Sequence, residues 1–89
     1  MAKLITYDLC TPGKDYPNLI AAIKKYPNVY KVTESCWLTS SGDSCTIIRN
    51  NLWQFMDSND KIFVATLTGE TSGQNIICGQ AGLNKAVFT

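Results

Sequence analysis

The segment from Lys3 to Lys14 constrains the fold most, because a short apolar stretch ends there in a single carboxylate and a tight turn. Asp8 is the only charged residue between the two lysines. A charge late in an apolar strand lies near the strand end, where ligands of α/β sheets usually bind. A Pro-Gly pair then predicts a turn. We therefore expect a strand over 3–9, a turn over 10–14 and a candidate site at Asp8.

The rest of the chain alternates between helical and extended patterns. Apolar residues recur at helical spacing in two segments and predict two buried helix faces, Leu19, Ile20, Ile23 and Tyr26 in the first and Ile47, Ile48, Leu52 and Phe55 in the second. The expected elements after the first strand are a helix capped by Asp15 or Tyr16 with Pro17 in its first turn, an extended segment over 29–38, a helix from Asp43 or Ser44 to about Met56, a strand over 61–68, a short strand at 76–78, and a short helix or strand over 83–88.

The extended segment over 29–38 leaves two arrangements open. It forms one bent strand or a short hairpin broken near Glu34 and Ser35. Either way, the order of elements predicts an α+β sandwich, with both helices on one face of an antiparallel sheet, as in ferredoxin-like folds. At 89 residues, we expect a single domain over 1–89.

Composition excludes several classes of protein and site. No run of about 18 apolar residues is present, so we expect no membrane span, and the N-terminus lacks the pattern of a signal peptide, so we expect a cytoplasmic protein. There is no histidine, and the four cysteines form no Cys-x-x-Cys pair, so a zinc site is not expected. We expect reduced, mostly buried thiols at Cys10, Cys36, Cys45 and Cys78.

The small net charge of +1 is unevenly distributed. Residues 1–31 hold five lysines against two aspartates, and residues 32–89 have a balance of −2. Strong binding to duplex DNA needs many phosphate contacts, which this charge does not supply. The distribution suits a ligand with one or two phosphates.

Four short motifs occur in a fixed order, and together they carry a resemblance. They are Tyr-Asp-Leu at 7–9, Pro-Gly-x-Asp-Tyr at 12–16, Glu-Ser-x-Trp-Leu at 34–38 and Asp-Ser-x-Asp-Lys at 57–61. Over residues 3–68 the chain resembles small bacterial and phage proteins described as SinR-like, which are related to the small CRISPR adaptation subunit, the Cas-two family.

The resemblance implies a ferredoxin-like homodimer whose last segment reaches toward the partner chain. It also implies that Asp8 corresponds to the strand-end aspartate proposed in that family as a metal ligand for phosphodiester cleavage. The family's Ser-apolar-aromatic motif corresponds to Ser35, Cys36 and Trp37. Function within the family is diverse, so the resemblance implies the fold more strongly than the activity.

Each candidate site residue has a functional and a structural interpretation. Asp8 is a magnesium ligand, paired with Asp8 of the other chain across a dimer axis, or a carboxylate that accepts hydrogen bonds from the following turn. The turn from Thr11 to Lys14 presents amides and a charge to a phosphate, or is an ordinary turn. Tyr7 and Trp37 stack on a base or pack in the core. Arg49 binds a phosphate through its forked guanidinium or is a solvated residue on a helix face. The loop that contains Gln74 and Asn75 closes over a ligand or is simply solvated.

The main hypothesis is a homodimer that binds a nucleotide-type ligand without catalysis or cofactor. The ligand is a free or cyclic nucleotide signal or a short nucleic acid, and a phage-encoded dimer of this kind would sequester a host immune signal. We expect the pocket at the dimer interface, lined by Tyr7, Asp8, Lys14, Trp37 and the loop around Gln74. The alternative is a Mg²⁺-dependent nuclease or phosphodiesterase built on Asp8, and a third possibility is a protein-interaction adaptor.

Overall fold

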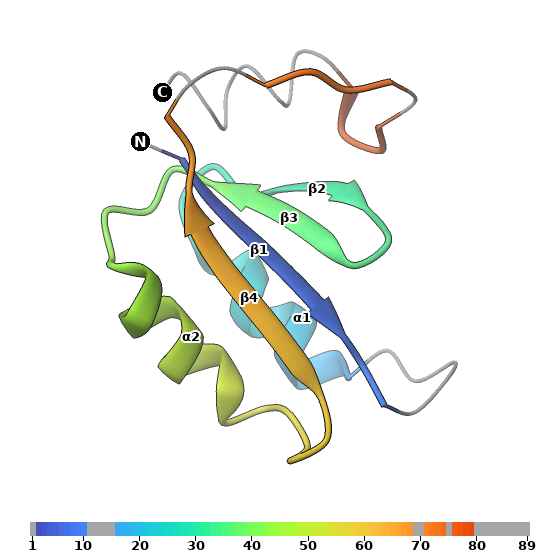
Figure 1. Ribbon diagram of the computed structural model, residues 1–89, viewed down its shortest axis with the longest axis vertical. Helices are drawn as coiled ribbons and strands as arrows, with labels where there is room; N and C mark the ends of the chain where they lie inside the picture. The colour runs from blue at the N-terminus through green and yellow to red at the C-terminus, as the bar shows by residue number, and fades with distance from the viewer. Residues whose placement is uncertain (1, 11–15, 69–70, 75, 80–89) are drawn as a thin grey trace.

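A four-stranded antiparallel sheet with two helices forms the body of the protein (Figure 1). The computed structural model describes residues 2–10, 16–68, 71–74 and 76–79. The elements are β1 (Lys3–Asp8), α1 (Pro17–Lys24), β2 (Tyr30–Thr33), β3 (Cys36–Thr39), α2 (Cys45–Trp53) and β4 (Lys61–Thr66). The strand order is β2-β3-β1-β4. The α+β class, the antiparallel sheet and the two helices are therefore as the sequence predicts.

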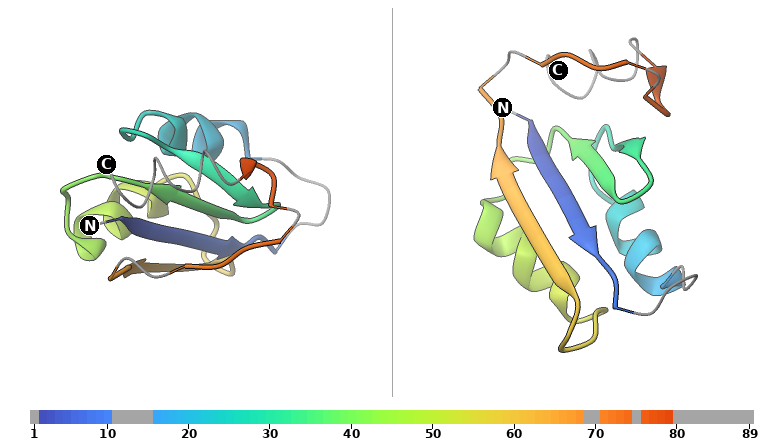
Figure 2. Two further views of the ribbon diagram at one scale, coloured as in Figure 1. Left: turned by 90° about the horizontal axis from the view of Figure 1, so that it is seen from above. Right: turned by 45° about the vertical axis from the view of Figure 1, so that its right-hand side comes forward.

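The first strand is central, because β1 pairs with β3 on one side and with β4 on the other. Alternation along β1 sends Ile5 and Tyr7 to the face that packs against both helices. On the opposite face, Leu4 contributes to a smaller apolar cluster with Leu38. Figure 2 shows α1 under the β2–β3 hairpin and α2 beside β4. One face of the sheet is thus covered by helices.

The two helices differ in how well their buried faces follow the sequence pattern. In α1, Pro17 is the first residue, and Leu19 and Ile23 are fully buried. In α2, the Ser44 hydroxyl caps the helix by accepting from the Ile47 amide at 3.2 Å, and Ile48 and Leu52 are fully buried. The first helix thus starts as expected and buries Leu19 and Ile23, whereas Ile20 and Tyr26, which are also predicted on its buried face, are only partly buried.

The predicted burial of Ile47 and Phe55 is wrong. Their exposed fractions are 56% and 36%. The buried face of α2 is defined by Ile48 and Leu52, which lie four residues apart, and Ile47 lies about 100° around the helix from Ile48. The helix ends at Trp53 rather than near Met56, so Phe55 belongs to the turn after it.

Two predictions for extended segments are resolved. Residues 29–38 form the hairpin, with Glu34 and Ser35 at the turn between β2 and β3. The strand expected at 76–78 is wrong. The backbone there turns, since the Gly79 amide donates to the Ile76 carbonyl at 3.3 Å and Gly79 has a φ of 70°, which glycine adopts without strain. The element expected over 83–88 lies outside the described residues.

The segment 71–79, described apart from residue 75, packs on the sheet face opposite the helices, near β2 (Figure 1). Ile76 and Cys78 join the apolar cluster of Ala2 and Leu38, and the Ile77 amide donates to the Val32 carbonyl at 2.9 Å. Within the described residues, no helix is long and apolar enough to cross a membrane.

Candidate ligand-binding cleft

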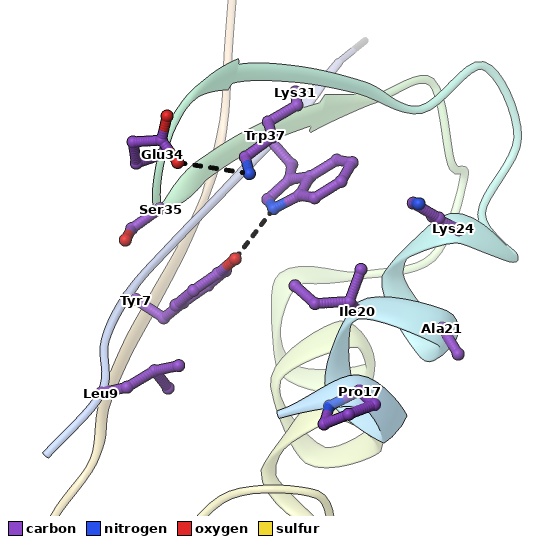
Figure 3. Close-up of a pocket in the computed structure, with 10 residues that line it drawn as sticks. All are labelled: Tyr7, Leu9, Pro17, Ile20, Ala21, Lys24, Lys31, Glu34, Ser35 and Trp37. Atoms are coloured by element: carbon purple, nitrogen blue, oxygen red, sulfur yellow. Dashed lines mark hydrogen bonds and ion pairs between the residues drawn. The ribbon is translucent and has the colours of Figure 1, made fainter. Parts of the chain in front are cut away.

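An open cleft lies between α1 and the β2–β3 hairpin (Figure 3). Its volume is about 740 Å³, within the range of roughly 300–1,000 Å³ typical of small-molecule sites. An apolar wall comes from α1 and the end of β1, and consists of Leu9, Pro17, Ile20 and Ala21. The polar lining comes from Tyr7, Lys24, Lys31, Glu34, Ser35 and Trp37. We call this the α1–hairpin cleft.

A hydrogen bond between Tyr7 and Trp37 forms the inner end of the cleft. The Trp37 indole Nε1 donates to the Tyr7 hydroxyl oxygen at 3.0 Å, which fixes the two rings (Figure 3). The side chains meet because Trp37 pairs in register with Ile5, two residues before Tyr7 on the same face of β1. The exposed fractions of Tyr7 and Trp37 are only 7% and 5%. Both rings are therefore core residues that present an edge to the cleft, rather than open platforms for base stacking.

The Tyr7 hydroxyl retains a donor. A phenol can both donate and accept, and Tyr7 uses its oxygen as the acceptor for Trp37. Among the described residues, no acceptor receives the Tyr7 proton. A ligand in the cleft can accept this hydrogen bond, so Tyr7 is a directional polar contact at the inner end of the cleft.

Two lysines place positive charge at the cleft. Lys31 Nζ lies 5.6 Å from the centroid of the Trp37 ring, a cation–π distance, and 3.6 Å from a Glu34 carboxylate oxygen. Lys24, in the last turn of α1, forms no ion pair with any described residue. With Glu34 the one carboxylate among the lining residues, the cleft has a net positive charge and favours an anion.

The other predicted site residues do not lie in the cleft. Asp8 alternates with Tyr7 and so projects to the opposite face of β1, where it pairs in register with Lys61. Arg49 lies in a separate groove next to β4. Gln74 is exposed on the segment near β2. Three candidates, Thr11, Lys14 and Asn75, lie outside the described residues.

Sequence reasoning missed Lys24, Lys31 and the apolar wall. A lysine at position 24 is favourable at the end of any helix, so the sequence alone does not indicate a site there. Lys31 becomes recognisable once β2 and β3 are known to pair, because its register partner is Trp37. The pattern of the first helix contains the signal for the wall, since Ile20 is only partly buried and faces the cleft.

A second polar group, which we call the Asp60 cluster, consists of Cys10, Tyr16, Asp57 and Asp60. The buried Asp60 carboxylate accepts from the Cys10 amide at 2.6 Å, the Asp57 amide at 2.7 Å and the Tyr16 hydroxyl at 3.2 Å. The Tyr16 hydroxyl also lies 3.0 Å from Asp57 Oδ2. This cluster joins the end of β1, the start of α1 and the turn before β4.

Hydrogen bonds control the ionisation of Asp60. Burial acts to raise the pKa of its carboxyl, but the bonds from the Cys10 and Asp57 amides and the Cys10 and Tyr16 side chains together lower the pKa below its ordinary value of 3.8. Asp60 is therefore a carboxylate at neutral pH. Its oxygen atoms accept hydrogen bonds from the protein's own donors.

The Asp60 cluster also contains atoms of metal-binding types. Cys10, Asp57 and Asp60 each offer a ligand atom within 4.8 Å of the others. Their hydrogen bonds already account for the geometry, since the amides and the Tyr16 hydroxyl converge on the carboxylates. Asp8 is not part of this group.

The cysteines are less buried than expected. No disulfide joins any two of the four; Cys10 is exposed, and Cys36, Cys45 and Cys78 are half-buried. The prediction of mostly buried thiols is wrong because each lies at a strand end, a helix end or in the segment near β2. Burial raises the pKa of the Cys36 thiol, although its hydrogen bond with Thr33 opposes this effect. Cys36 is thus protonated at neutral pH.

Comparison with known proteins adds no assignment, because no family model and no solved structure matches the chain.

Proposed function

We propose that this protein is a non-catalytic binding protein for a small anionic ligand of nucleotide type, held in the α1–hairpin cleft. The observation that carries the proposal is the convergence of the available Tyr7 donor with Lys24 and Lys31 on one apolar-walled cleft. A nucleotide combines a polar, partly apolar base with a negative phosphate. The cleft offers complementary groups for each part.

The charged groups divide the cleft into two regions. Lys24 has no competing carboxylate, so it suits a phosphate oxygen. Lys31 is held between Glu34 and the Trp37 ring, and a ligand that attracts its ammonium outward would uncover the indole. The Ser35 hydroxyl, at the hairpin turn, adds a donor and acceptor for a ribose or base.

The order of elements supports the ferredoxin-like assignment implied by the resemblance. The chain runs β-α-β-β-α-β, with β1 inside the antiparallel sheet. Residues from the four motifs that carry the resemblance also form hydrogen bonds with one another. Tyr16 from one motif bonds Asp57 and Asp60 from another, and Tyr7 bonds Trp37 across two others.

The sheet face opposite the helices supports a homodimer. Phe63, 64% exposed, lies on it opposite Thr6, and Asp8 lies opposite Lys61 at the same end. An exposed phenylalanine next to a pair of opposite charges is self-complementary about a two-fold axis. Two copies packed through this face would bury Phe63 and bring each Lys61 toward the Asp8 of the partner subunit. The cleft then lies on the far side of the sheet, not at the dimer interface.

Sequestration is the role that fits such a protein. Glu34, the one carboxylate among the residues that line the cleft, is paired with Lys31, so the described lining offers no uncommitted general base. Capture of an immune signal in the cytoplasm by a phage protein follows from this proposal together with the resemblance.

The alternative, a Mg²⁺-dependent nuclease built on Asp8, is supported less well. Magnesium is held by oxygen ligands, among them one or two carboxylates, and the register partner of Asp8 is Lys61, a cation that competes with a metal. The clustered carboxylates of Asp57 and Asp60 serve the protein's own donors. The residues around Asp8 therefore do not fit a magnesium site.

A thermal-shift screen tests the proposal. The purified protein is heated with nucleoside monophosphates, cyclic nucleotides, cyclic dinucleotides and short oligonucleotides, with and without Mg²⁺. A ligand that binds the native state raises the Tm, and we expect a metal-independent rise with a small nucleotide that is recovered intact. A rise only with oligonucleotide and Mg²⁺, or recovery of cleaved ligand, would instead support the nuclease.

The location of binding needs a matched pair of variants. Lys24→Gln removes a charge that lines the cleft, and Lys25→Gln removes the neighbouring exposed charge, which does not line it. Only the first should reduce the shift. Equal loss in both variants would show a general electrostatic effect and contradict the assignment to the cleft.

A further inference from the structure

The two edges of the sheet are protected to different degrees. The edge strand β2 has four residues and an irregular register between Lys31 and Thr33, and the Ile77 amide bonds its Val32 carbonyl. Short length, irregularity and a covering segment are the usual devices that prevent an edge from pairing with another chain. The β2 edge has all three.

The β4 edge has almost none of these devices. It runs for six residues in continuous register with β1, without proline or bulge. Lys61 at its start is its one charged residue. On its outer side, β4 has no neighbouring strand within the described part of the chain. A long, regular, unprotected edge is a template for strand addition.

A groove of about 530 Å³ lies next to the start of this edge, between α2 and β4. Its lining includes Arg49, Trp53, Lys61 and Ile62. Trp53 is 40% exposed, and the Arg49 guanidinium is held by hydrogen bonds of 3.2 and 2.9 Å to Asn50 Oδ1. Tryptophan and arginine are the residues enriched at the energetic centres of protein interfaces.

The charged residues that line the groove indicate which kind of partner would bind there. Asp60 also lines the groove, but its carboxylate is satisfied by the Cys10 and Asp57 amides and the Tyr16 hydroxyl. Arg49 and Lys61 therefore provide the charges available to a partner at this end of the edge, Arg49 on the α2 side and Lys61 on the opposite face, and both are positive. Trp53 and Ile62 next to them favour apolar side chains.

We propose that the outer edge of β4 binds an extended segment of a partner protein that carries both acidic and apolar side chains. The segment would add to the sheet through main-chain hydrogen bonds along β4. On the α2 side of the sheet, a carboxylate would contact Arg49 and apolar side chains would contact Trp53 and Ile62, and on the opposite face a carboxylate would contact Lys61. This surface is separate from the α1–hairpin cleft, so the proposal does not depend on the proposed ligand.

A second copy of this chain fits the edge less well. Antiparallel pairing of β4 with itself would set the end that carries Arg49 and Lys61 against the end that carries Thr66. Thr66 lies next to Cys45, with its hydroxyl 3.4 Å from the thiol, and neither is an acidic residue. The two positive groups would then lack partners, whereas an acidic peptide supplies them.

Peptide titration followed by NMR tests the proposal. The probe is a short synthetic peptide with the repeat Glu-Glu-Val-Val, which places both residue types on each face of an extended segment, added to the ¹⁵N-labelled full chain. We expect chemical-shift changes in the β4 amides and the Trp53 indole, and none in the Trp37 indole. A matched peptide with lysine in place of glutamate, and a glutamate peptide N-methylated along one edge, should not bind.

Protein variants provide the second half of the test. Arg49→Glu with Lys61→Glu should weaken binding of the glutamate peptide roughly tenfold or more, and Lys24→Glu should leave it unchanged. The proposal is overturned by equal binding of the lysine peptide, by shifts confined to the cleft, or by no shift at about 1 mM peptide, where even weak complexes form. Self-association through β4, or binding of a short oligonucleotide in place of the peptide, would also overturn it.

Discussion

Tyr16 and Tyr7 are both nearly buried tyrosines near the same end of the sheet, but their hydroxyl groups are used in opposite ways. Tyr16 donates toward the carboxylates of Asp57 and Asp60, which lie 3.0 and 3.2 Å away. Tyr7 accepts from the Trp37 indole and keeps its proton available to the cleft. The Asp60 cluster is thus satisfied from within, whereas the cleft is not.

This difference separates a polar group that stabilises the fold from one that binds. A buried polar network in which each donor meets an acceptor holds segments together, and its loss leaves groups without partners. A cleft that keeps a donor and a cation available can satisfy them with a ligand. The Asp60 cluster should therefore control stability, and the cleft should control affinity.

Removal of the Asp60 carboxylate should have the largest effect. Asp60→Ala leaves the Cys10 and Asp57 amides without their acceptor and separates the end of β1 from the turn before β4. We expect the Tm to fall by roughly 10 °C, measured by circular dichroism. Asp43→Ala, at an exposed aspartate, is the control and should change the Tm little. Equal effects of the two substitutions would contradict a structural role for the cluster.

The same carboxylate predicts a pH dependence. Because the folded-state pKa of Asp60 is lowered, its contribution to stability is complete above the unfolded-state pKa, near 3.8, and is lost as the pH falls through the lower folded-state pKa. Denaturant unfolding across this acid range should show a steeper loss of stability in the wild type than in Asp60→Asn. Identical slopes would mean that another group causes the acid sensitivity.

Paired substitutions of the two tyrosines test the comparison directly. Tyr16→Phe should lower the free energy of unfolding by about 1–3 kcal/mol and leave affinity for the nucleotide found in the screen unchanged. Tyr7→Phe should lower stability by a similar amount, since the Trp37 indole loses its acceptor, and should also weaken nucleotide binding by roughly tenfold. Affinity is measured by calorimetry for both variants, and an equal loss of affinity in the two would contradict the difference between the tyrosines.

Much of the fold follows from local patterns, and much of the site does not. The burial of Leu19 and Ile23 follows from their helical spacing, and the start of α2 follows from the capping side chain of Ser44. Both features are local in the sequence, so the positions of the helices are predictable. The exposure of Ile47 depends on which side of α2 meets the sheet, which no local pattern contains. Tyr7 and Trp37 are both predicted to line the pocket, but their burial and their hydrogen bond depend on the register of β1 with β3. Asp8 failed to join them because adjacent residues of a strand face opposite ways.

The smallest expected effects are those of the two cleft lysines, and they distinguish the parts of the site. Lys24→Gln and Lys31→Gln should each weaken nucleotide binding about three- to tenfold, and both losses should shrink as salt is added because exposed charges are screened. Lys31→Gln also removes the cation from the Trp37 ring and the partner of Glu34. If Lys31 blocks the indole in the free protein, its substitution should cost less affinity than that of Lys24. A greater cost would show that Lys31 contacts the phosphate directly.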